Sequence, residues 1–312
     1  MSQKIERVEF EGGLGAKLAG RLELPAGQPR AFALFAHCFT CSKDVFAASR
    51  IASRLCAQGI AVLRFDFTGL GQSDGDFANT NFSSNVGDLV RAANFLRDNY
   101  EAPKILIGHS LGGAAVLAAA ADVPEATAVA TIGAPADAAH VADNFGSHIE
   151  AIEADGEAEV ELAGRTFRIR KSFLDDIRGQ EITPRIAQLK KALIVFHAPR
   201  DATVGIENAE KIFVSARHPK SFVSLDDADH LLTRRTDAAY VADVLSAWAT
   251  RYLGEALEDN KPIVRADPDR VTVVETRAGK FQNQVLAGRH MLTADEPESV
   301  GGMDTGPTPY QY

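Results

Sequence analysis

The sequence predicts an α/β fold with a mostly parallel central sheet and helices on both of its faces. Short β-rich runs alternate with amphipathic helical patterns through most of the 312 residues, which is the order of elements that builds parallel sheets. Several runs are apolar at every position, as strands buried on both faces should be. The hydrophobic fraction of 46% is ample for one large core, and the length favours a domain of roughly 250 residues with an appendage.

The expected strands and helices follow one another in a regular order. Residues 6–10 and 16–25 flank the Gly-rich residues 11–15, so they predict an antiparallel hairpin. The other core strands are expected at 31–37, 60–67, 104–110, 128–135, 192–199 and 221–230. Helical patterns occupy 44–59, 83–100, 110–123, 205–218 and 235–253.

An insert at about 145–185 interrupts this order, and its centre, residues 156–173, alternates with period two. A two-residue turn at Ala163 and Gly164 predicts a hairpin with one apolar and one charged face. The expected cross-strand pairs are Val160 with Phe167, Ala158 with Ile169, Glu159 with Arg168 and Glu157 with Arg170. The hairpin is either a surface protrusion without a function or a lid over a pocket at the carboxyl ends of the strands, where open α/β sheets bind ligands. We favour the lid.

The strongest chemical signal is the G-x-S-x-G pattern within Ile107–Gly113. It follows an apolar strand and opens a helix of small residues, the context in which a serine is projected above the sheet on a tight turn. Gly108 and Gly112 leave room for that turn, and the helix N-terminus favours negative charge developing beside Ser110. Ser110 is therefore the predicted nucleophile.

A neutral serine needs a general base, and the base needs an orienting acid. The order expected on this fold is serine, acid, histidine, with each on a loop after a late strand. Asp201 and His230 occupy those places. The other histidines are expected to be core or solvated residues: His37, His109, His140, His148, His197, His218 and His290. Asp226, Asp227 and Asp229 lie too close to His230 in sequence to reach the far side of its ring.

These residues resemble the α/β-hydrolases of the esterase and acyl-aminopeptidase type over residues 1–256. The turn at Arg64–Gly75 is similar to that family's R-F-D-x-x-G-x-G-x-S-D-G, and His37–Asp44 is similar to its H-G-F-x-G-x-K-[DE] loop, with cysteine in place of both glycines. The resemblance implies that the backbone N–H groups of Phe39 and Leu111 form the oxyanion hole. It implies an acyl-enzyme mechanism on small-molecule esters, in particular small aryl or hydroxycinnamoyl esters as in cinnamoyl (feruloyl) esterases.

Other activities stay open. The same three side chains serve a serine peptidase or amidase and a thioesterase. From a different class, Cys38 and Cys41 form a C-x-x-C pair between a strand and a helix, the context of a thiol-redox protein. No cofactor is expected, and no metal either, because a metal site needs three or four ligands and no spacing here suggests one.

The last residues have a different character. Residues 257–270 are polar and contain two prolines, so they predict a linker. Residues 271–312 resemble the opening of an OsmC-like domain through their D-E-P and G-G-x-D-x-G-P-x-P-Y strings. Because that family's peroxidatic cysteines come on later helices and no cysteine follows Cys56, we expect an incomplete domain without thiol peroxidase activity. OsmC-like domains are intertwined dimers, so the resemblance implies a homodimer through this region.

The net charge and the hydropathy pattern limit the partners and the cellular location that we expect. The formal net charge of −9 argues against a nucleic-acid partner. The first ten residues have no apolar h-region, and no apolar stretch reaches the ~20 residues needed to cross a bilayer. We therefore expect a cytoplasmic protein that has no membrane partner.

Overall fold

The computed structural model describes residues 4–38, 41–162, 164–254, 270–276, 279–288 and 290–311. The chain divides into two compact units. The larger unit contains the described residues up to 254, apart from a short stretch between two strands, and the smaller unit contains those from 270 onwards. Each unit is described by itself.

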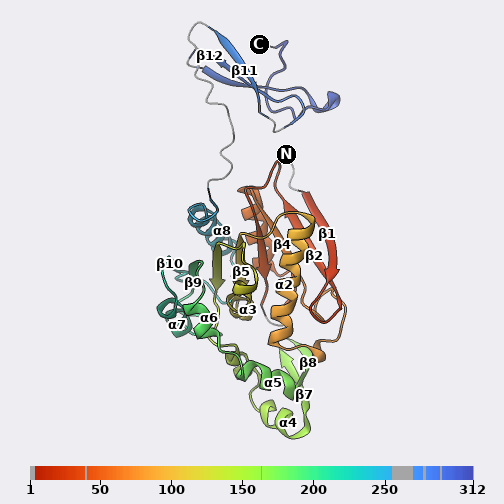
Figure 1. Ribbon diagram of the computed structural model, residues 1–312, viewed down its shortest axis with the longest axis vertical. Coiled ribbons are helices and arrows are strands. Elements are labelled where there is room, and N and C mark those ends of the chain that lie inside the picture. Colours follow the sequence, from red (N-terminus) through yellow and green to blue (C-terminus); the bar gives the residue numbers. More distant parts are fainter. Residues whose placement is uncertain are drawn as a thin grey trace. The chain divides into compact units, whose positions relative to one another are not determined.

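The larger unit is built on an eight-stranded sheet of order β1-β2-β4-β3-β5-β6-β9-β10 (Figure 1). The first two strands form the predicted antiparallel hairpin, β2 pairs antiparallel with β4, and all later neighbours are parallel. The bounds are β1 Lys4–Glu11, β2 Lys17–Leu24, β3 Ala31–Ala36, β4 Ile60–Phe65, β5 Ile105–His109, β6 Ala128–Ile132, β9 Ala192–His197 and β10 Lys220–Ser224. The predicted parallel sheet is confirmed. Its last strand ends earlier than expected, because residues 225–230 form a loop.

Helices cover both faces of this sheet. The side chains of β3 show why, since Leu34 belongs to one buried apolar cluster and Ala33 and Phe35 belong to the other. One face is covered by α1 (Phe46–Ala57) and α8 (Arg235–Ala249). The opposite face is covered by α2 (Phe82–Asn99), α3 (Leu111–Ala119), α6 (Ile182–Ala187) and α7 (Glu207–Ser215). None of the helices within the described ranges is long and apolar enough to span a bilayer.

The insert contains the predicted hairpin in the predicted register. Strands β7 (Glu157–Leu162) and β8 (Arg165–Arg170) pair Val160 with Phe167 and Glu159 with Arg168; the turn residue Ala163 lies outside the described residues. Short helices that the sequence did not predict flank it, namely α4 (His148–Asp155) and α5 (Lys171–Arg178). Both are eight residues long, too short for a clear helical period.

The apolar face of the hairpin joins the main core. Val160, Phe167 and Ile169 are 1%, 6% and 1% exposed and belong to the cluster beneath α2 and α3. Phe167 packs on Phe77 of the 3-10 turn Phe77–Asn79, with ring centroids 4.9 Å apart. The hairpin is therefore fixed to the domain through its side chains, although its two strands pair only with each other.

The smaller unit is a three-stranded antiparallel sheet, which confirms the predicted β-rich extension. Its strands are β11 (Val271–Glu275), β12 (Asn283–Ala287) and β13 (His290–Ala294), followed by a 3-10 turn at Glu298–Val300. The buried carboxylate of Asp295 organises the following loop by accepting hydrogen bonds from the backbone N–H groups of Glu296, Met303 and Thr305. The predicted linker at 257–270 lies outside the described residues except for Arg270.

Replacing Phe167 with alanine is expected to lower the free energy of unfolding of the larger unit by roughly 3 kcal/mol, because it removes a buried aromatic ring that packs on Phe77. Urea denaturation followed by circular dichroism measures this change. Thr166→Ala is the matched control, because Thr166 is the exposed neighbour on the same strand. Equal stabilities of the two variants would show that the hairpin is not part of the cooperative core.

Candidate active site

Ser110 lies on a sharp turn between β5 and α3, in a left-handed backbone conformation with φ of 55°. This conformation is costly for a residue with a side chain and persists only where the surroundings hold it. A Cβ on Gly108 would lie 2.2 Å from the carbonyl oxygen of Gly112, and a Cβ on Gly112 would lie 2.5 Å from that of Ala36. The two glycines of the motif are therefore required by the close approach of α3 to β5 and to the end of β3.

The structure brings Ser110, His230 and Asp201 together in a hydrogen-bonded chain. The Nδ1 atom of His230 lies 2.7 Å from Asp201 Oδ2, and its Nε2 atom lies 3.0 Å from Ser110 Oγ. Since the carboxylate can only accept, Nδ1 carries the proton and Nε2 is free to accept the serine proton. Ser110 follows β5, Asp201 follows β9 and His230 follows β10. The carboxyl ends of these parallel strands lie at one edge of the sheet.

Asp201 is held as a carboxylate. Its Oδ1 atom accepts hydrogen bonds of 2.9 Å from the backbone N–H groups of Thr203 and Val204, and Oδ2 accepts from His230. Burial raises the pKa of Asp201, but the hydrogen bonds from His230, Val204 and Thr203 together outweigh it, so the pKa is lower than usual. A negative charge at this position stabilises an imidazolium at His230.

The neighbouring carboxylates are engaged elsewhere. Asp226 accepts from the hydroxyl of Ser224 at 2.8 Å, and Asp229 accepts from the backbone N–H and hydroxyl of Thr233. Within the described residues, neither carboxylate forms a hydrogen bond with the ring of His230.

Of the two predicted oxyanion donors, Leu111 is among the described residues and Phe39 is not. Leu111 is the first residue of α3 and is 4% exposed. Its N–H has no acceptor within the helix, as is general for the first turn. The N–H is therefore available beside Ser110. Phe39 lies outside the described residues.

Buried charges anchor the loop that contains Phe39. Asp66 is fully buried and accepts from the backbone N–H of Lys43 at 2.6 Å, from Lys43 Nζ at 2.5 Å and from the backbone N–H of Gln72 at 2.9 Å. Arg64 donates to the backbone carbonyl of Lys43 and pairs with buried Glu23 at 2.6 Å. Lys43 of one sequence motif and Arg64 and Asp66 of the other thus belong, with Glu23, to one buried network.

Cys38 and Cys41 are joined by a disulfide, with their Cα atoms 5.4 Å apart. The sequence predicts a C-x-x-C pair here but not that its two cysteines are bonded to each other. Cys56 on α1 is free and buried, and burial raises the pKa of its thiol to about 12, with a contribution from Glu23. Cys56 is therefore a packing residue and not a reactive thiol. No group of three or more His, Cys, Asp or Glu within the described ranges is arranged to hold a metal ion.

Two histidines that the sequence analysis set aside support the site. The Nε2 atom of buried His109 lies 2.7 Å from the backbone carbonyl oxygen of His230, and the two rings are 5.3 Å apart. His197 likewise contacts the backbone carbonyl of Val204 at 2.7 Å, in the loop that holds Asp201. The position of His109 beside the nucleophile was the only sequence signal. Its partner, a backbone atom 121 residues away, was not visible there.

His109 is expected to make the protein less stable as the pH falls. Burial and the nearby His230 lower the pKa of His109 from 6.5 to about 4. Between those pH values the unfolded chain binds a proton that the folded chain excludes, so stability is lost as the pH falls from 6.5 toward 4. The loss between pH 7 and pH 5 from this residue is about 2 kcal/mol.

The measurement is urea denaturation at pH 7 and pH 5 on the wild type and on His109→Gln. Glutamine keeps a donor for the carbonyl of His230 and does not titrate, so the pH-dependent loss should shrink by about 2 kcal/mol. Buried His37 also has a lowered pKa, caused first by burial, and remains in both proteins. An unchanged loss in the variant would contradict the assignment.

Comparison with known proteins agrees with this fold. The profile of a family described as "Serine aminopeptidase, S33" matches residues 27–155. Among solved structures, the esterase domain of a Rhodothermus marinus protein is 51% identical, with a TM-score of 0.66, and the match covers 80% of this chain and all of that domain. A ferulic acid complex of Est1E from Butyrivibrio proteoclasticus is 17% identical, with a TM-score of 0.65 over 79% of this chain and 99% of Est1E, and supports the fold alone.

One relative has a name that states a different activity. The mouse protein named palmitoyl-protein thioesterase ABHD10, mitochondrial, is 36% identical over 191 residues, which are 57% of this chain. The match spans 62% of the mouse protein's length. With the nucleophile turn, the parallel sheet and the full-length match to the Rhodothermus esterase domain, these similarities show that the chain belongs to the α/β-hydrolase family.

Proposed function

We propose that this protein is a serine hydrolase of carboxylic esters that works through an acyl-enzyme. The observation that carries the proposal is the chain of hydrogen bonds from Ser110 through His230 to Asp201, at 3.0 and 2.7 Å. This arrangement supplies a nucleophile, a general base and an acid that orients the base.

The first half of the reaction forms the acyl-enzyme. His230 Nε2 takes the proton of Ser110 as Oγ bonds to the ester carbonyl carbon and the carbonyl oxygen becomes an oxyanion. The N–H groups of Leu111 and Phe39 stabilise that oxyanion, and Asp201 stabilises the imidazolium. His230 then gives its proton to the leaving alkoxide oxygen as the ester C–O bond breaks, which releases the alcohol.

The second half repeats these steps with water. His230 takes a proton from water, the hydroxide oxygen bonds to the acyl carbon, and the Ser110 ester bond breaks. Ser110 recovers its proton from His230, and the carboxylic acid leaves. The close packing at Gly112 and the left-handed backbone of Ser110 support the proposal, because they fix the turn that places Oγ 3.0 Å from His230 Nε2 and puts Leu111 at the start of α3.

The substrate proposed from the loop and lid resemblance is a small aryl or hydroxycinnamoyl ester. Thioester hydrolysis is a second candidate, supported by the 36% identity to a protein named palmitoyl-protein thioesterase. Amide hydrolysis is a third, supported by the match to the family described as serine aminopeptidase. All three use the same nucleophile and base, so the leaving group and the acyl pocket distinguish them. A cytoplasmic location stays a prediction.

Ser110→Ala is expected to lower kcat for p-nitrophenyl acetate by at least about 10⁴-fold, because the nucleophile is lost. Asp201→Asn should lower it by a similar factor, since the wrong tautomer of His230 is then stabilised. Ser215→Ala is the matched control, because within the described part of the chain that hydroxyl bonds only to the backbone carbonyl of Lys211 in its own helix. Wild-type turnover in Ser110→Ala would rule out the proposed nucleophile.

The thiol-redox alternative is tested with the same assay. A Cys38→Ser, Cys41→Ser double variant should keep ester hydrolysis within about tenfold of the wild type if Ser110 is the nucleophile. If the cysteines were responsible for the measured activity, the double variant would lose that activity and Ser110→Ala would keep it.

Removal of the proposed lid should change the preference for acyl groups more than the rate on acetate. The backbone N–H of Lys171 lies 2.8 Å from the carbonyl oxygen of Gly156, so residues 157–170 can be replaced by a short glycine bridge. The wild type and this variant are compared on acetyl, octanoyl and hydroxycinnamoyl esters. Identical preference in a variant with a native circular dichroism spectrum would exclude a lid role for the hairpin.

For the smaller unit we propose that residues 271–312 are related to OsmC-like domains, as the sequence motifs predict, and take part in a homodimer. Exposed apolar side chains on its sheet support this proposal. Val271, Val273 and Met291 are 65%, 59% and 63% exposed.

A further inference from the structure

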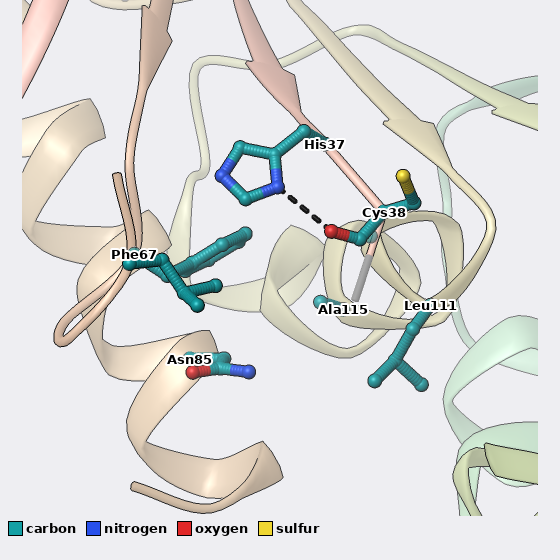
Figure 2. Close-up of a pocket in the computed structure, with 8 residues that line it drawn as sticks. His37, Cys38, Phe67, Asn85, Leu111 and Ala115 are labelled. Carbon is teal, nitrogen blue, oxygen red and sulfur yellow. Dashed lines mark hydrogen bonds between the residues drawn. The ribbon is translucent and has the colours of Figure 1, made fainter. Parts of the chain in front are cut away.

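A small cavity lies beside the nucleophile turn (Figure 2). It is lined by His37, Cys38, Phe67, Leu70, Asn85, Leu111, Gly112 and Ala115. Leu111, which supplies one of the proposed oxyanion donors, is part of this lining. The carbonyl oxygen of a bound ester would therefore lie at the edge of this cavity.

The order of the strands shows which half of an ester the cavity faces. Its wall residues follow β3 and β4 or belong to α2 and α3, and in the sheet β3 and β4 lie on one side of β5. Asp201 and His230 follow β9 and β10, on the opposite side of β5. His230 must protonate the leaving alcohol, so the alcohol lies toward β9 and β10. The acyl group then extends toward β3 and β4, into the cavity.

The cavity wall is mostly apolar, with the amide of Asn85 and the ring of His37 as its polar side chains. Phe67, Leu70, Leu111 and Ala115 provide carbon surface, and the ring of His37 donates through Nδ1 to the backbone carbonyl of Cys38. Asn85, from the first turn of α2, is 8% exposed, and within the described ranges its side chain makes no hydrogen bond. Figure 2 shows its amide directed toward the space between Phe67 and Leu111.

A buried amide without a partner costs free energy unless something binds it. An amide both donates and accepts, so a hydroxyl group is its natural complement. The free space in the cavity is about 10 Å³, which is about what one water molecule needs. That space suits an acyl group with a very short chain. The hydroxycinnamoyl ester proposed above from the resemblance would need the walls to move apart, so the two acyl groups are alternative substrates of the same proposed hydrolase.

From these observations we propose that the cavity is the acyl pocket of the hydrolase and that Asn85 selects short acyl groups carrying a hydroxyl, such as a 2-hydroxyacetyl group. The proposal rests on the ester hydrolase function proposed above. Asn85 acts as a specificity-determining residue, because it contacts the substrate away from the reacting atoms.

The test compares ethyl glycolate with ethyl propionate, whose acyl groups differ by a hydroxyl in place of a methyl. The kcat/KM ratio of glycolate to propionate is measured by pH-stat for the wild type and for Asn85→Leu. Loss of one hydrogen bond should lower this ratio about threefold to tenfold. The ratio does not depend on the folded fraction of a preparation. Asn99→Leu, at the exposed C-terminal end of the same helix, is the matched control and should leave the ratio unchanged.

A variant of a different wall residue tests the acyl pocket independently of Asn85. Leu70→Ala removes wall volume and should raise kcat/KM for ethyl butyrate relative to ethyl acetate by about tenfold, while Leu96→Ala, a buried leucine at the other end of α2, should not.

The outcomes separate the two proposals. A wild-type protein that hydrolyses neither these esters nor p-nitrophenyl acetate would overturn the proposed function itself, whereas hydrolysis of p-nitrophenyl acetate alone would overturn the acyl pocket. Ester hydrolysis with a glycolate-to-propionate ratio unmoved by Asn85→Leu would overturn the role of Asn85, and an acyl-length preference unmoved by Leu70→Ala would overturn the acyl pocket. In both cases the serine hydrolase would remain.

Discussion

The constraint on which the candidate site depends is the close packing of the start of α3 against three strands. Gly108 and Gly112 meet backbone atoms at distances that no Cβ would tolerate, and a Cβ on Gly113 would lie 2.4 Å from the Cβ of Ala134 beyond β6. This packing holds Ser110 in its left-handed conformation, in which Oγ lies 3.0 Å from His230 Nε2. It also fixes the N–H of Leu111 and one wall of the adjoining cavity.

A second constraint acts on the facing loop. A glycine-rich loop would be expected after β3 in this family, but here the loop contains a disulfide between Cys38 and Cys41 and is followed by buried Lys43. Asp66 neutralises Lys43 and also binds its backbone, so the loop after β3 is fixed to the loop after β4. Breaking such a buried pair by removing one partner typically costs 3–5 kcal/mol. The charges thus restrict both the position of the loop and the shape of the cavity between the two loops.

Two buried histidines support the candidate triad through contacts with backbone carbonyl groups. His109 contacts the backbone carbonyl of His230, and His197 contacts that of Val204 in the Asp201 loop. Burial favours the neutral form of His109 at pH 7. A neutral ring can donate to a carbonyl without placing a second positive charge beside the imidazolium that forms at His230.

The sequence by itself determined the order of strands and helices, the register of the inserted hairpin, and Ser110, Asp201 and His230 as candidates. Those features depend on local periodicity and on chain order, which one sequence contains. Only the tertiary structure decided which side chains support them. The partner of His109, the disulfide of the Cys38 loop and the unpaired amide of Asn85 depend on segments brought together by the sheet order. Contacts across such distances leave no periodic trace in the chain, because they arise from packing between elements and not from the pattern within one.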